Sequence, residues 1–579
     1  MKKRTLAMLL AGIMCIGLLA GCGGGTTPST EPSAAPSESV EPSQAPADGP
    51  FELSVNFASE PQTIDPALNS AVDGAIMINH MFEGLMKWED SGNEAHGADG
   101  TVTLARITEG QAESFDKAVN ADGTVTYTFK LRDDAKWSDG KAVTAGDFVY
   151  SWQRLVNPET AADYSYMIDC VVNANEIMAG EKDPSELAVS APDDKTFVVT
   201  ITTDLPYFTE ICAFPATFPV REDIIASAGD KWTFDTATYI SNGAYKMTAW
   251  NHNAEIVMEP NEYYYDAANL GPAKITFKLM DDQNAMLSGF NAGELDFIQQ
   301  VPQAELAGKI ASGDMKIVDY IGTYYVCFQT QKAPFDDPRV REAFSLAIDR
   351  TYIVENVSQA GEVEAGGFVP AGIYDAAGAN GDDFRTTGGN YYEPTDAEYE
   401  ANCEKARQLL ADAGYPNGEG FPVVEYLYNT ADNHKAIGEA LQFMWEDVLG
   451  VTVTLNNQEW GTFLATRKNG DYSIARNGWI ADYNDPMSFI DMWMTGGGNN
   501  DAQYSNPEFD ALVAAAKVET DANKRMELLH QAENILIGED CVLAPIYFYT
   551  QMHMMDENID GVYYTPLGYY FFMYAQPTA

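Results

Sequence analysis

Basic side chains are scarce in this sequence of 579 residues, which has 34 lysines and arginines against 86 aspartates and glutamates and a formal net charge of -52. A field of that sign repels phosphate backbones, so we do not expect nucleic acid as a partner. Hydrophobic residues make up 45% of the chain and aromatic residues 12%, which is too high for a disordered protein. The length permits a large core and suggests more than one domain.

Cysteine is also rare. Of seven cysteines, Cys15 and Cys22 lie near the amino terminus. The other five form no C-x-x-C pair and have no histidine at zinc-binding spacing. We therefore expect neither a metal site nor a disulfide framework, while a single disulfide stays open.

Motifs of the common enzyme classes are missing. The sequence contains no H-E-x-x-H, no G-x-S-x-G, no P-loop and no D-x-D-x-D-G calcium loop. A glycosidase-type carboxylate pair has no identifying spacing, so a secreted hydrolase remains a distant alternative. We expect a protein that is not an enzyme and needs no cofactor.

The amino terminus carries a leader. MKKR precedes a short apolar run that ends in small residues, which is typical of a secretory signal peptide, here residues 1–21. The sequence LAGC at 19–22 resembles the bacterial lipobox, which implies a diacylglyceryl group on Cys22. Residues 22–50 then read as a disordered tether rich in Pro, Ser and Gly. We expect the lipid alone to hold the protein to a membrane, because no later apolar run is long enough to span one.

Strands and helices alternate in the body of the chain, from Phe51 onward. Residues 126–132 and 195–202 have the alternating, β-branched pattern of strands. Asp337-Pro338 is typical of a helix start, and two further helices are expected to end at Gly414 and Gly450. Between about 336 and 480 this alternation predicts an α/β lobe.

Several stretches stand out in order along the body. They are SEPQTIDP (59–66), MFEGLMKWE (81–89), YTFKLRDDAKWSDGKAVTAGDFVYSWQRLVNPETA (127–161), SNGAYKMTAW (241–250), FDDPRVREAFSLAIDR (335–350), YNTADNHK (428–435), NQEWGTFLATR (457–467) and GWIADYNDPMSF (478–489). Together they resemble the periplasmic oligopeptide-binding proteins, which are solute-binding proteins of family 5 and the receptors of peptide ABC importers. The similarity covers essentially all of the chain after residue 50.

The resemblance implies an α/β fold of the type II periplasmic binding protein kind, with two lobes, a hinge and an inserted third domain. Carried over, lobe I would comprise residues 51–93, 229–325 and 541–579. The inserted domain would be 94–228 and lobe II would be 326–540. The hinge strands would lie near 323–330 and 544–550, and ligand binding would close the lobes.

The resemblance also implies the ligand, a short extended peptide held between the lobes. Asp482 would bind the α-ammonium group, because a desolvated carboxylate is costly without a cation. Arg476, Arg467 and His434 would serve the free carboxylate for different peptide lengths. The residues alone also allow a solvent-exposed Asp482, structural ion pairs for the arginines and a helix-capping His434.

A further set of side chains would form the wall of the cleft. These wall residues are Trp460, Trp479, Tyr549, Tyr164 and Val72. Core packing is the alternative for the two tryptophans, and the spacing around Tyr164 departs by one residue from the family pattern.

Three positions depart from the family pattern. Asn356 stands where the family has a lysine for longer peptides, and Gly322 and Ile480 replace a cysteine pair of the enteric members. Both departures leave the preferred peptide length open.

Taken together, the resemblance implies a monomeric, extracytoplasmic, lipid-anchored receptor that delivers short peptides to the membrane permease of an ABC importer. Alternatives within the fold are a signalling peptide, a cell-wall peptide, or another solute such as nickel or an oligosaccharide. The aspartate at 482 argues for a free amino end and against the last two.

Overall fold

The computed structural model describes residues 49–57, 59–94 and 103–578, and the chain from Pro50 onward belongs to one structural unit. The predicted signal peptide, Cys22 and the tether up to residue 48 lie outside the described residues. Among the described residues, no helix is both long enough and apolar enough to cross a bilayer.

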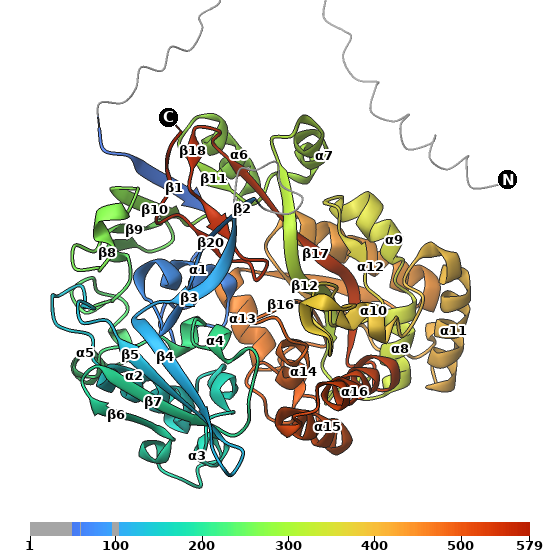
Figure 1. Cartoon of the computed structure of the whole chain (residues 1–579). Coiled ribbons are helices and arrows are strands. Elements are labelled where there is room, and N and C mark those ends of the chain that lie inside the picture. Colours follow the sequence, from blue (N-terminus) through green and yellow to red (C-terminus); the bar gives the residue numbers. More distant parts are fainter. Residues whose placement is uncertain (1–48, 58, 95–102, 579) are drawn as a thin grey trace, which may run out of the picture. The chain divides into compact units, whose positions relative to one another are not determined.

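A mixed sheet of eleven strands runs through this unit in the order β15-β14-β16-β12-β17-β11-β1-β10-β9-β8, with β13 paired to β17 (Figure 1). β1 is parallel to β10 and β11, and β14 is parallel to β15 and β16. Parallel pairs of this kind need crossover connections, which here contain helices. The strands are β1 (Glu52–Asn56), β8 (Tyr245–Asn251), β9 (Glu255–Pro260), β10 (Lys274–Lys278), β11 (Phe297–Ile298), β12 (Lys316–Phe328), β13 (Val363–Glu364), β14 (Val424–Asn429), β15 (Val453–Gln458), β16 (Ile474–Ile480) and β17 (Leu543–Met555).

Two strands of 13 residues each, β12 and β17, join the two halves of this sheet. They run antiparallel and side by side, with Lys316 opposite His553 at one end and Cys327 opposite Leu543 at the other (Figure 1). β11 pairs with one end of β17, and β16 pairs with the opposite end of β12. The chain therefore passes between the halves twice at the same place.

Two four-stranded sheets are separate from the large sheet in the strand pairing. One is antiparallel, in the order β4-β5-β7-β6, and the other has the order β2-β3-β19-β20. α2 packs on the first sheet, where the Trp152 ring lies 5.2 Å from the ring of Phe197. The elements are β2 (Met86–Glu94), β3 (Thr103–Glu109), β4 (Ala112–Val119), β5 (Val125–Leu131), β6 (Val189–Asp193), β7 (Thr196–Ile201), β19 (Tyr563–Tyr564), β20 (Tyr570–Phe571) and α2 (Ala145–Val156). β5 and β7 confirm the two strands predicted from alternation.

Three neighbouring helices belong to the predicted α/β region (Figure 1). They are α8 (Pro338–Leu346), α11 (Tyr399–Asp412) and α12 (Asp432–Leu449). α12 contacts β14 and β15, α8 contacts β17, and α11 packs on the other two helices. Asp337 caps α8 by accepting a hydrogen bond from the backbone N–H of Arg339, and Gly450 ends α12 with φ +71°. Trp445 and Phe344 are fully buried in the core between them. The predicted helices and the α/β character of this region are confirmed.

The remaining helices and short strands complete the described chain. They are α1 (Val72–Met81), α3 (Ala174–Met178), α4 (Phe208–Ile211), α5 (Glu222–Ala228), α6 (Gln283–Asn291), α7 (Gln303–Ser312), α9 (Arg350–Tyr352), α10 (Phe384–Gly388), α13 (Trp460–Lys468), α14 (Met487–Ile490), α15 (Pro507–Val518), α16 (Ala522–Glu533), β18 (Ile559–Asp560) and β21 (Gln576–Pro577).

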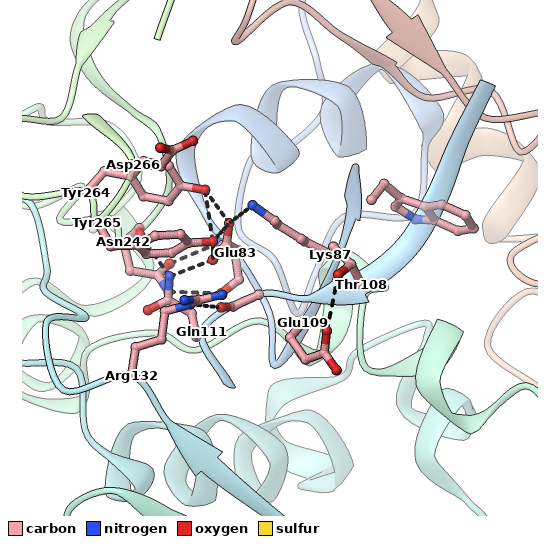
Figure 2. A network of polar contacts seen from close by, with 12 residues as sticks. Glu83, Lys87, Thr108, Glu109, Gln111, Arg132, Asn242, Tyr264, Tyr265 and Asp266 are labelled. Atoms are coloured by element: carbon pink, nitrogen blue, oxygen red, sulfur yellow. Dashed lines mark hydrogen bonds and ion pairs between the residues drawn. The ribbon is translucent and has the colours of Figure 1, made fainter. Parts of the chain in front are cut away.

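A buried carboxylate fastens three of these segments together (Figure 2). Glu83, two residues after α1, accepts hydrogen bonds from Nε2 of Gln111 at 2.9 Å and from the hydroxyls of Tyr264 at 2.6 Å and Tyr265 at 2.9 Å. The Arg132 guanidinium lies 4.3 Å from the centre of the Tyr265 ring. Because a carboxylate has room for several donors, one side chain can hold the start of β4 and the loop after β9 in fixed register with the end of α1.

Two open questions about pairing are answered by the structure. The five described cysteines are buried and form no disulfide: Cys170, Cys212, Cys327, Cys403 and Cys541. Gly322 and Ile480 face each other across β12 and β16, so the two positions for which the resemblance implies a cysteine pair are cross-strand neighbours here. Within the described chain, no group of three or more His, Cys, Asp and Glu side chains could hold a metal ion.

Candidate functional site

A cavity of about 380 Å³ lies where α1, α13, β16 and β17 come together. This volume is in the range of small-ligand pockets. All nine predicted binding residues line it, although they come from positions 72 to 549 of the chain: Val72, Tyr164, His434, Trp460, Arg467, Arg476, Trp479, Asp482 and Tyr549.

Asp482 lies two residues after the end of β16 and is 7% exposed. Its Oδ1 accepts a hydrogen bond from the Tyr164 hydroxyl at 3.0 Å, and its Oδ2 accepts one from the Ser488 hydroxyl at 3.4 Å. Burial raises the pKa of Asp482 well above its ordinary value, and these two hydrogen bonds offset only part of that rise. No cation pairs with Asp482 among the described residues. A carboxylate in this state favours a ligand that brings its own positive charge.

Tyr164 reaches Asp482 across a separation of 318 residues. Its ring lies 6.1 Å from the ring of Trp479 and 4.9 Å from that of Phe214. The Trp479 indole N–H donates to the backbone oxygen of Ser488 at 2.7 Å. The displaced spacing around Tyr164 therefore still brings its hydroxyl to the carboxylate, and aromatic contacts fix the angle of approach.

Arg476, on β16, is the counterpart of opposite charge. Its guanidinium faces three aromatic rings, at 5.4 Å from Tyr324, 5.9 Å from Phe463 and 6.0 Å from Trp460. Its buried Nε forms no hydrogen bond, and within the described chain no carboxylate forms an ion pair with Arg476. The rings stabilise the cation without neutralising it, so the charge is available to an anion.

The other two predicted partners of a carboxylate are less available. Arg467, on α13, has its Nε 2.7 Å from Oδ2 of Asp501 in an ion pair. The Tyr324 hydroxyl lies 3.4 Å from Nδ1 of His434. Burial and the charge of Arg476 lower the pKa of His434 well below its ordinary value, so the imidazole is neutral at pH 7. Arg476 is therefore the cation of this set that has no acidic partner among the described residues.

Sequence reasoning missed one carboxylate of the cavity. Asp73 is the second residue of α1, next to Val72, and it is 9% exposed. Its Oδ2 is buried and accepts no hydrogen bond from a described residue, and burial raises its pKa to about 6. An acidic residue in the first turn of a helix is common for reasons of the helix dipole. The sequence therefore held no signal that would single it out.

Comparison with known proteins assigns the chain to a family. Residues 106–501 match the model of the bacterial extracellular solute-binding proteins, family 5. The chain belongs to this family. The oligopeptide-binding protein OppA of Bacillus subtilis strain 168 is 34% identical over 579 residues, with 99% of each chain covered. The resemblance found in the sequence is confirmed, and so is the expectation that the chain is not an enzyme, because the family consists of binding proteins.

Solved family 5 structures confirm the two-lobed, type II periplasmic binding fold. Haemophilus influenzae OppA in complex with RPPGFSPFR has a TM-score of 0.82 at 31% identity, covering 92% of this chain and 100% of that one. The unliganded open form of the murein tripeptide-binding protein MppA scores 0.56 at 33% identity, covering 90% and 95%. The chain is therefore structurally more similar to the peptide complex than to this open form.

Proposed function

We propose that this family 5 protein captures short peptides with free ends between its two lobes and delivers them to the membrane permease of an ABC importer. It would act as a monomer on the extracytoplasmic face of the membrane, anchored by a lipid on Cys22. The proposal rests on the charge pattern of the cavity, on family membership and on the leader sequence.

The observation that carries the proposal is the pair of unpartnered opposite charges in one cavity. Among the described residues, Asp482 has no cationic partner and Arg476 has no anionic partner. A ligand that has both an ammonium and a carboxylate group would satisfy both at once through charge-assisted hydrogen bonds. A peptide with free ends is such a ligand, and its backbone can pair as an added strand.

The remaining predicted residues would adapt the cavity to different peptides. Arg467 would bind the carboxylate of peptides of another length, either while its ion pair with Asp501 is kept or after that ion pair breaks. His434 would contribute as a neutral hydrogen-bond donor. Trp460, Trp479, Tyr549, Tyr164 and Val72 would form the walls. Side-chain tolerance would be broad, because the backbone and the ends supply the affinity while water fills the rest of the cavity.

Closure would follow the domain division expected from the sequence. Lobe I would use residues 51–93, 229–325 and 541–579, with residues 94–228 as the inserted domain and 326–540 as lobe II. β12 and β17 would serve as the hinge, since the chain passes between the halves of the large sheet along them. A bound peptide would then select the closed arrangement.

The test is thermal unfolding of the purified protein with tri- to pentapeptides. A free peptide at 100 times its Kd should add about 2.7 kcal/mol to the free energy of unfolding and raise the Tm. Amino-terminal acetylation of the same peptide should abolish the shift, because it removes the cation that Asp482 lacks. Carboxyl-terminal amidation should reduce the shift, because it removes the anion for Arg476. Equal stabilisation by the acetylated peptide would show that the assigned role of Asp482 is wrong.

A further inference from the structure

The cavity contains more acidic than basic side chains. Two acids already have basic partners, in the ion pairs of Asp163 with Lys468 and of Asp501 with Arg467. The charged residues of the lining are Asp73, Asp163, Asp281, Glu362, Asp482, Asp501, Arg467, Lys468 and Arg476. If the two ends of a peptide pair with Asp482 and Arg476, three carboxyl groups remain unbalanced. These are Asp73, Asp281 and Glu362.

Asp73 differs from the other two. Asp281 is exposed to water, which screens its charge. Glu362 accepts a hydrogen bond from the backbone N–H of Ala360 at 2.8 Å. Asp73 is nine-tenths buried, and its Oδ2 accepts no hydrogen bond from any described residue. An oxygen that has lost water without gaining a donor is the costly case, so this position is the one that a ligand donor would improve most.

The surroundings of Asp73 provide no cation. It lies in the first turn of α1, and no ion pair to it is formed within the described chain. The indole N–H of Trp460, on α13, lowers the pKa of Asp73 but forms no hydrogen bond within the normal geometric limits. Asp73 and Trp460 both line the cavity, and the Asp73 Oδ2 has no donor among the described residues.

We propose that Asp73 receives a basic side chain of the bound peptide, so that this protein prefers peptides containing lysine or arginine over neutral peptides of the same shape. This inference rests on the proposed peptide-binding function and adds a substrate class to it. A lysine ammonium or an arginine fork would bring both the missing donor and the missing charge to the same place.

The test compares ligands that differ only in charge. Alanine tetrapeptides carry either lysine or norleucine at positions 1 to 4 in turn, and their Kd values are measured by calorimetry. In the unmodified protein, lysine at one position should bind at least about tenfold more tightly than norleucine, as expected for one desolvated charge pair. In Asp73→Asn, that preference should disappear, while the norleucine peptide should bind within about twofold of its original Kd.

Matched variants separate Asp73 from the general negative field. Asp281→Asn and Glu362→Gln each remove the same charge from the same cavity and should keep the lysine preference. Asp73→Glu, which restores the charge, should keep part of it. Thermal unfolding of each free variant checks that it folds.

The outcomes distinguish the two proposals. Absence of lysine preference in the unmodified protein, or equal loss of it in Asp281→Asn or Glu362→Gln, would overturn the role of Asp73 and leave peptide binding intact. If Asp73→Asn weakens the binding of all peptides equally, Asp73 does not distinguish between peptide side chains and the inference is wrong. If no peptide with free amino and carboxyl ends binds, the proposed function itself is contradicted.

Discussion

Asp482 and Arg476 bring opposite charges into one cavity, and neither has a partner of opposite charge among the described residues. Both side chains are held by groups that orient them without neutralising them, a tyrosine hydroxyl for one and aromatic rings for the other. The cost of removing their charges from water is therefore recovered only when a ligand arrives. This makes each of them a sensitive target for substitution.

Asp482→Asn should weaken the binding of peptides with free amino ends by about 2–5 kcal/mol, because the ammonium group loses its charged acceptor in a desolvated site. Binding should also depend on pH. Burial raises the pKa of Asp482 in the free protein, and a bound ammonium lowers it again. Affinity is thus full above the pKa of the free protein and is lost as pH falls through it.

Calorimetry with an alanine peptide between pH 8 and pH 5 measures this dependence. The affinity should decrease toward pH 5, and the decrease should be much flatter in Asp482→Asn. Neutral side chains in the peptide keep the titration of Asp73 from dominating the result. An affinity that rises on acidification would have the wrong sign for a carboxylate that binds an ammonium group.

At the residue scale, the sequence predicted which side chains meet but not how they are paired. The nine residues assigned from the family resemblance all line the cavity. The hydrogen bond from Tyr164 to Asp482, the ion pair of Arg467 with Asp501 and the free state of Arg476 depend on distances between segments far apart in the chain. Asp73 was not predicted, because burial and the lack of a donor are invisible in a helix-start pattern.

Secondary-structure elements were more predictable where the signal is local. The cap at Asp337 and the helix end at Gly450 follow from side-chain and backbone properties of single residues. The pairing of β12 with β17 joins residues more than 200 positions apart, and no local pattern sets that register. The same holds for the network around Glu83, whose donors come from two distant segments, one with Gln111 and one with Tyr264 and Tyr265.

Glu83→Ala should lower the free energy of unfolding by about 3 kcal/mol, since the donors of Gln111, Tyr264 and Tyr265 lose their shared buried acceptor. Urea unfolding of the purified protein measures the change.

Glu109→Ala is the matched control. Glu109 is a half-buried glutamate whose carboxylate accepts a hydrogen bond from the Thr108 hydroxyl (Figure 2). Its substitution should change the free energy of unfolding by no more than about 0.5 kcal/mol. Equal effects of the two substitutions would show that the network of Glu83 contributes nothing of its own.

At the scale of the whole molecule, the chain is structurally more similar to a peptide complex of the family than to an open form. The negative charge of the chain and the acidic excess of its cavity have the same sign. Both should draw positively charged ligands toward the cleft, most strongly at low ionic strength. The predicted leader would add a location at the membrane, which the body alone does not specify.

Cys22→Ala should release the protein from the cells that make it, because the thiol that would carry the lipid is gone. Fractionation of cells and medium with an antibody measures the distribution. The Tm of the released protein should equal that of the body purified without its leader. Retention of the variant in the membrane fraction would contradict a lipid anchor on this residue.

The bond between Tyr164 and Asp482 has a consequence for time as well as for affinity. The hydroxyl comes from the predicted inserted domain and the carboxylate from predicted lobe II. The ammonium group of a bound peptide would therefore be enclosed by two groups that move apart when the lobes open. Dissociation of the peptide would then require the two halves to open first, and the residence time of the peptide would be set by the frequency of opening. A Tyr164→Phe variant should shorten this residence time while leaving the association rate almost unchanged.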